Sequence, residues 1–326
     1  MSPLLQAVLT IALGVGGCVG YFFGANLVLD KVLFPARGPH LARNITRANM
    51  IRPWVFLFPA IFASGLYLAY PVVGSFFRSL YDRTGSTYVG TGNYTFLFSD
   101  DGFRQALLNN FLWLLVVPAG ATAFGLLAAQ LTDRLRWGNF AKSLIFMPMA
   151  ISFVGASLIW KFVYANDADI GLINALRAAL GANAAVDVLQ IPFWNNFFLM
   201  LILVWIQTGF AMVILSAALR GIPEETVEAA IIDGASPLQI FFRIKAPQIM
   251  GTIVVVWTTI TLLTLKIFDI VYTMTGGNFG TEILPSYMMS FMFKDDGRAT
   301  SVAFVIMVLV LPVMIWNIRQ SRKEMR

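Results

Sequence analysis

Residues 222–248 read IPEETVEAAIIDGASPLQIFFRIKAPQ, and they form the longest polar, charge-bearing interruption in the hydrophobic second half of the chain. Pro223 suits the first position of a helix, and Glu224 and Glu225 then place negative charge at the positive end of the helix dipole. Gly234 is the residue type at which a helix usually stops. This part of the stretch therefore predicts a short helix that ends at a glycine.

A second short helix is predicted directly after the glycine. Ser236 can cap it, Pro237 suits its first turn, and Gln239 follows the serine at the spacing of a capping box. Pro247 closes the segment against the next hydrophobic run. The expected structure is a helix, a glycine joint and a helix, lying between two membrane spans.

Composition sets the class of the whole chain. Hydrophobic residues make up 58% of the sequence, charged residues only 12%, and the mean hydropathy is +0.74, which excludes a soluble domain of this length. The net charge of +6 does not indicate nucleic-acid binding, because the basic residues lie in short loops between apolar runs. One cysteine and one histidine exclude an internal disulfide and a histidine-rich metal site.

Long apolar runs predict an all-α integral membrane protein, because about 20 apolar residues cross a bilayer as a helix. The seven expected spans cover residues 4–29, 54–76, 111–131, 144–163, 196–218, 250–275 and 300–318. No Lys or Arg precedes the first run, so we expect a permanent helix there and not a signal peptide. Pro148 should kink the fourth span, and residues 171–180 should form a short amphipathic helix outside the membrane.

Orientation follows from the basic loops. A basic stretch that runs from Lys31 through Arg37 to Arg52 follows the first span, and further basic residues follow the third and seventh spans. Loops rich in Lys and Arg are retained in the cytoplasm. We therefore expect the N-terminus outside, and the C-terminus and residues 222–248 on the cytoplasmic side.

The sixth span carries two ionisable residues, Lys266 and Asp269. At a spacing of i, i+3 on one helix they share a face and can pair. Charged groups at membrane depth usually face a pathway or a partner and not lipid. A structural ion pair between helices and a role in a transport pathway both stay open.

Three groups of residues carry a resemblance to a known family. The first consists of Glu228, Ala229, Ala230, Asp233, Gly234, Ala235, Ser236, Phe241, Arg243, Ile244 and Pro247. The second is GTGNYTFLF at residues 90–98, where Gly92 and Asn93 are by themselves typical of a turn, and the third is FDIVYTMTGG at residues 268–277. Together they resemble the inner-membrane permease subunits of bacterial ABC importers, above all the binding-protein-dependent sugar permeases of the maltose and α-glucoside type.

The resemblance covers about residues 49–326 and implies a six-helix permease core, with residues 1–48 as one extra N-terminal helix and a basic linker. Residues 222–248 resemble the EAA loop, which in this family is the cytoplasmic coupling helix that docks into a groove on an ATP-binding subunit. The implied complex lies in the bacterial inner membrane. Its other members would be two ATP-binding cassette ATPase subunits, a second related permease chain and a periplasmic binding protein that delivers a sugar.

No catalytic site, metal site or cofactor is expected in this chain. It contains no Gly-Lys dipeptide and so lacks the end of a Walker A loop, which leaves ATP and Mg²⁺ to the partner ATPase. We expect closure of the ATPases to push residues 222–248 as a lever, with Gly234 as the joint and Glu228 and Asp233 offering charge. The apolar residues expected to fill the partner's groove are Val227, Ile231, Ile240, Phe241 and Ile244.

Candidates for the substrate pathway are polar or aromatic residues of the spans. They are Trp205, Gln207, Lys266, Asp269 and Tyr272. Packing, or anchoring at the membrane interface, is the commoner role of such side chains.

Other functions remain open at this point. The solute could be an osmolyte or a glycerol phosphate, carried by a permease of the same class. A secondary transporter would need acids at membrane depth or an internal repeat, and Asp269 is the one convincing acid there. A membrane-embedded enzyme lacks an evident catalytic set.

Overall fold

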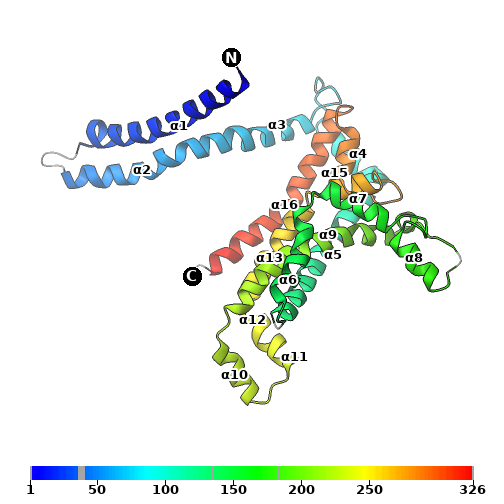
Figure 1. Ribbon diagram of the computed structural model, residues 1–326. Coiled ribbons are helices and arrows are strands. Elements are labelled where there is room, and N and C mark those ends of the chain that lie inside the picture. Colours follow the sequence, from blue (N-terminus) through cyan, green and yellow to red (C-terminus); the bar gives the residue numbers. More distant parts are fainter. Residues whose placement is uncertain (1, 36–40, 134, 183, 325–326) are drawn as a thin grey trace. The chain divides into compact units, whose positions relative to one another are not determined.

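The computed structural model describes residues 2–35, 41–133, 135–182 and 184–324. Helices dominate these ranges, and their only extended pairing is an isolated bridge between Tyr81 and Tyr88. Five helices are long and apolar enough to cross a membrane, and seven spans result if each of two sharply bent helix pairs counts as one (Figure 1). The expected seven-span, all-α architecture is confirmed, although Arg37 of the basic stretch lies outside the described residues.

The chain divides by its contacts into two units, Met1–Gly74 and Ser75–Arg326. The first unit contains α1 (Pro3–Leu27), which continues as a π-helical turn (Val28–Leu33), and α2 (Leu41–Ser64). The Tyr21 hydroxyl donates to the carbonyl oxygen of Val55 at 2.7 Å, and Arg52 pairs with Asp30. These two contacts hold α1 against α2. The functional boundary expected after residue 48 stays a prediction.

A second π-helical turn (Gly65–Ala69) follows α2 and leads into α3 (Tyr70–Ser79). The remaining helices belong to the second unit. They are α4 (Gly92–Ser99), α5 (Asp101–Thr132), α6 (Gly138–Phe146), α7 (Phe153–Val163), α8 (Leu172–Ala179), α9 (Trp194–Arg220), α10 (Glu224–Ile232), α11 (Pro237–Ile240), α12 (Ala246–Gln248), α13 (Met250–Thr264), α14 (Asp269–Met274), α15 (Leu284–Phe291) and α16 (Asp296–Glu324). The short outer helix expected over residues 171–180 is confirmed as α8.

Helix α9 is the centre of the second unit, because it is buried along most of its length. Gly125 of α5 lies directly on α9, where a Cβ atom would come within 2.9 Å of the backbone nitrogen of Met212. Gly209 of α9 lies on α6, where a Cβ atom would come within 2.7 Å of the carbonyl oxygen of Ile145. Small residues of this kind let transmembrane helices pack with their backbones in contact.

The fourth span is broken and not merely kinked. Helix α6 ends at Phe146, a 3₁₀ turn (Met147–Ala150) holds Pro148, and α7 leaves at an angle of 106°. Ser152 caps α7 by accepting a hydrogen bond from the backbone nitrogen of Gly155 at 3.1 Å. The expected kink was therefore too mild, because a capping serine starts a new helix directly after the proline turn.

The sixth span is also broken. Helix α13 ends at Thr264, residues 265–268 are not helical, and α14 begins at Asp269. Lys266 and Asp269 therefore do not share a helical face, and no ion pair joins them in the described part of the chain. The expected pairing was wrong, because the helix is interrupted between the two residues.

The segment that begins at Gly92 is a helix and not a turn, since α4 starts there. Asn93 is buried in its first turn and donates hydrogen bonds to the carbonyl oxygens of Ser79, at 2.8 Å, and Tyr81, at 2.7 Å. The asparagine thus anchors the short helix to the end of α3.

Candidate functional site

Residues 222–248 form the expected helix, glycine joint and helix at one end of the second unit (Figure 1). Gly234 joins the helices with a φ of +77°, a backbone conformation that favours glycine. Both hydrogen bonds of the capping box form, from the Ser236 nitrogen to Gln239 Oε1 at 2.8 Å and from the Gln239 nitrogen to Ser236 Oγ. Pro223 precedes the first helical residue of α10 instead of occupying that position. We refer to residues 222–248 as the loop.

The loop presents one face to solvent and another to its own chain. Glu228, Ala229, Asp233, Gly234, Ser236 and Pro247 are exposed, Ala235, Phe241 and Ile244 are half-buried, and Ala230 is buried. Ile240 is only 7% exposed and Val227 packs against the core, so neither is free to fill a groove on a partner.

Four large apolar side chains of the loop do point away from the rest of the chain. They are Ile231, Ile232, Leu238 and Phe242, with exposures of 59%, 86%, 72% and 65%. Of these, the sequence pattern indicated only Ile231, because spacing alone does not show which side of two linked helices faces the bundle. We call these four residues the apolar face of the loop.

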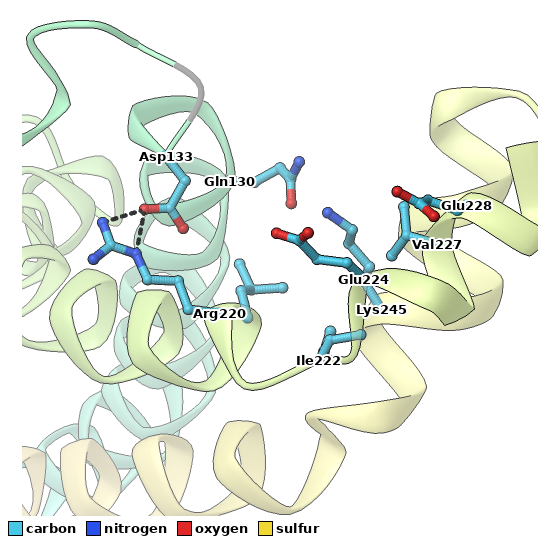
Figure 2. A pocket seen from close by; sticks show the side chains of 9 residues that line it. Gln130, Asp133, Arg220, Ile222, Glu224, Val227, Glu228 and Lys245 are labelled. Atoms are coloured by element: carbon cyan, nitrogen blue, oxygen red, sulfur yellow. Dashed lines mark hydrogen bonds and ion pairs between the residues drawn. The ribbon is translucent and has the colours of Figure 1, made fainter.

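A charged recess of about 510 Å³ separates the loop from the ends of α5 and α9 (Figure 2). It is lined by Gln130, Asp133, Leu219, Arg220, Ile222, Glu224, Val227, Glu228 and Lys245. Arg220 donates to Asp133 Oδ1 through Nε at 3.2 Å and Nη2 at 2.9 Å. Burial would raise the pKa of Asp133, but hydrogen bonds from Lys142, Arg220 and Ser216 outweigh it and hold that pKa below its ordinary value.

Two of the five pathway candidates meet in one small pocket. Gln207 and Asp269 line a pocket of about 370 Å³ together with residues from both sides of the α6–α7 break. Gln207 is only 5% exposed. The other lining residues are Met149, Ile151, Ser152, Phe153, Val154, Ile206 and Leu263. We call this space the break pocket.

The remaining three candidates lie elsewhere. Trp205 packs edge-on against Trp160 and lines a separate apolar pocket of about 730 Å³. Tyr272 is exposed and stacks on Phe268, with ring centroids 4.8 Å apart. Lys266 is exposed in the turn between α13 and α14 and does not line the break pocket.

Four buried asparagines, two in the third turn of α5 and two in the first turn of α9, hold the segment between α14 and α15. Asn109 donates to the carbonyl oxygens of Gly280, at 2.8 Å, and Glu282, at 2.7 Å. The remaining bonds of this clasp run from Asn195 to the Phe279 carbonyl, from Asn196 to the Gly280 carbonyl and from the Leu284 nitrogen to Asn110. Sequence reasoning missed the clasp, although paired asparagines at the start of two apolar spans are a visible signal.

The clasped segment contains Gly276 and Gly277, both with positive φ, which explains the two glycines of the FDIVYTMTGG run. A Cβ atom at Gly277 would lie 2.7 Å from Glu282 Oε1, so the carboxyl rests directly on the turn. Burial raises the pKa of Glu282, against a hydrogen bond from Ser286 that acts to lower it.

The chain is similar to known transport permeases along most of its length. Residues 121–324 match the family described as binding-protein-dependent transport system inner membrane component. The chain is 58% identical to the alpha-glucoside transport system permease protein AglF of Rhizobium meliloti, with 99% of both chains covered. It is 46% identical to the osmoprotective compounds uptake permease protein GgtC of Synechocystis sp., with 83% of this chain and 99% of that protein covered.

A solved structure shares the fold. It is the crystal structure of a bacterial alginate ABC transporter in complex with an alginate pentasaccharide-bound periplasmic protein. One of its chains aligns with a TM-score of 0.72 at 20% identity, covering 87% of this chain and 98% of that chain.

Asn109→Asp tests the clasp, because a carboxylate cannot donate to the two carbonyl oxygens that the amide serves. We expect the free energy of unfolding to fall by about 1–3 kcal/mol. Thermal unfolding of the purified protein in detergent, followed by tryptophan fluorescence, measures the change. Asn139→Asp on the exposed surface of α6 is the control, and equal unfolding midpoints for the two variants would contradict a stabilising clasp.

Proposed function

Because this chain belongs to the family of binding-protein-dependent transport system inner membrane components, we propose that it passes an α-glucoside across the inner membrane as the permease subunit of an ATP-driven importer. Membership of the family makes the chain a transport subunit that crosses the membrane several times. The observation that supports the solute is the 58% identity, over 99% of both chains, to an α-glucoside permease.

An osmoprotective compound is the second candidate solute. The observation in its favour is the 46% identity to an osmoprotective compounds uptake permease over 83% of this chain. The two candidates differ in the solute and not in the mechanism of the permease.

The proposed complex contains partners that supply what this chain lacks. Two ATPase subunits bind ATP and Mg²⁺ and hydrolyse the nucleotide, a second permease chain completes the pathway, and a periplasmic binding protein delivers the solute. The apolar face of the loop docks into a groove on one ATPase, because four exposed large apolar side chains on one short segment favour a protein partner. Glu228 and Asp233, which are exposed beside this face, offer charge to basic groups of that groove.

The loop is attached to two spans that reach the break pocket. Arg220 ends α9 just before the loop, and the segment Pro237–Gln248 bends by 72° into α13. Helix α9 carries Gln207, and α13 carries Leu263 of the same pocket. A push on the loop would therefore re-tilt both helices around the pocket and alternate its access as a rigid-body switch.

The break pocket suits a neutral, hydroxylated solute. The amide of Gln207 and the carboxylate of Asp269 are two polar groups in a mostly apolar lining, which is the usual composition of a small-molecule site. Irregular backbone at the break lines this pocket, and such backbone occurs at membrane depth where it lines a cavity.

The proposed orientation places the N-terminus outside and the C-terminus in the cytoplasm, because the basic loops then share one side with the loop. Green fluorescent protein fused to the chain reports this orientation, because it becomes fluorescent in the cytoplasm but not when it is exported unfolded across the membrane. We expect a fusion after Arg326 to fluoresce in intact cells. A dark but full-length fusion would place the C-terminus outside.

Gly234→Val tests the coupling role of the loop, since a β-branched residue does not readily adopt the φ of +77° at this joint. We expect solute transported per ATP hydrolysed to fall at least about tenfold in the reconstituted complex, a loss typical of broken coupling between sites. Gly181→Val is the matched control, because Gly181 has a φ of +89° with open space around it, away from the loop. Equal transport ratios for the two variants would remove the coupling role.

The solute is tested by uptake into proteoliposomes that hold the complete complex and its binding protein. We expect labelled maltose or sucrose to accumulate on addition of ATP, and Gln207→Leu to lower that uptake about tenfold or more, since a buried polar group that binds a hydroxyl would be lost. Thr208→Val, on the same helix but lining the other pocket, is the control. Accumulation of glycine betaine instead of both sugars would favour the osmoprotective alternative.

A further inference from the structure

One carboxylate joins three helices on the side of the loop. Asp133 directly follows α5 and accepts hydrogen bonds from Lys142 on α6 and from Ser216 and Arg220 on α9. The Ser216 hydroxyl lies 3.1 Å from Asp133 Oδ1, and Arg220 Nη2 lies 2.9 Å from it. Lys142 also donates to Ser216, so the four side chains form one connected network.

The inner part of this network is partly shielded from solvent. The side chains of Lys142 and Asp133 are 14% and 21% exposed, and Ser216 is buried, whereas Arg220 is 60% exposed. A shielded ion pair is screened less than a surface pair, and loss of one partner leaves an uncompensated charge. The charged groups that face the network across the recess are Glu224, Glu228 and Lys245.

The network lies between the loop and the broken fourth span. Arg220 is the last residue of α9, and the buried Ile222 begins the loop two residues later. Lys142 lies on α6, which ends in the break of 106°. The glycine contact between Gly209 and Ile145 joins α6 and α9 again near that break. Helix α6 is thus attached to α9 at two levels.

We propose that Asp133 is a positioning residue for coupling. It holds the ends of α5, α6 and α9 as one body, so that displacement of the loop moves the α6–α7 break together with α9. The break pocket, which has walls on both elements, then changes shape as a whole. This inference rests on the proposed coupling role of the loop. Without the carboxylate, α6 follows α9 only through the contact at Gly209, so the two helices move less completely together and ATP is hydrolysed with less solute moved.

Asp133→Asn tests the inference in the complete reconstituted complex, because asparagine keeps the shape and an acceptor but removes the charge. The probe is labelled maltose, or glycine betaine if the wild-type complex takes up that compound instead. We expect solute transported per ATP to fall about five- to tenfold while the ATPase rate stays within about twofold. Asp133→Glu, which keeps the charge, should restore most of the solute transported per ATP hydrolysed.

The matched control is Asp101→Asn at the opposite end of α5, where a 97% exposed carboxylate pairs with Arg104. This variant should leave the transport ratio unchanged. A network with a purely structural role would lower the thermal stability of Asp133→Asn without changing the ratio, and that result overturns the inference.

Failure of the inference can be told apart from failure of the proposed function. An unchanged ratio in Asp133→Asn, with coupling lost in Gly234→Val, overturns the inference alone, whereas an unchanged ratio in Gly234→Val overturns the coupling role itself. If Asp133→Asn does not assemble, the double variant Asp133→Asn with Lys142→Met is measured, because it leaves no unpaired charge in the shielded part. If the double variant transports about five- to tenfold less solute per ATP than the wild type, the inference is supported. If it transports as much solute per ATP as the wild type, the inference is overturned.

Discussion

The second unit depends on the contact of α9 with α5 and α6 at Gly125 and Gly209. Lipid is as apolar as the helices, so the hydrophobic effect does not hold such helices together, and close packing of backbones supplies the attraction instead. The buried helix α9 then carries a hydrogen-bonded network at each end. Asn195 and Asn196 start it within the clasp, and Arg220 ends it within the network on Asp133.

The two broken spans both contribute residues to the break pocket. The turn around Pro148 and the turn at residues 265–268 both free backbone groups that an unbroken helix would satisfy internally. Such breaks cost stability in lipid, so they persist where a cavity or neighbouring protein serves the freed groups. Met149 and Ser152 from the first break line the same pocket as Asp269, which starts the helix after the second break.

Local features of the structure could be predicted from the sequence. Ser236, Pro237 and Gln239 specify a capping box within four residues, and the apolar runs specify the spans, because both depend on short stretches of chain. The pairing of Lys266 with Asp269 failed because it assumed an unbroken helix. The clasp and the network were missed because they join distant residues, 171 positions apart for Asn109 and Gly280 and 83 for Asp133 and Ser216.

The clasp binds main-chain groups of the segment that it holds, namely the carbonyl oxygens of Phe279, Gly280 and Glu282 and the nitrogen of Leu284. Every residue type provides a main-chain carbonyl, so these bonds fix the course of the segment without fixing its composition. An exposed side chain of the segment, such as that of Phe279, can then differ while the backbone keeps its shape. Mutation can in this way alter the outer surface of the protein without altering the framework that supports it.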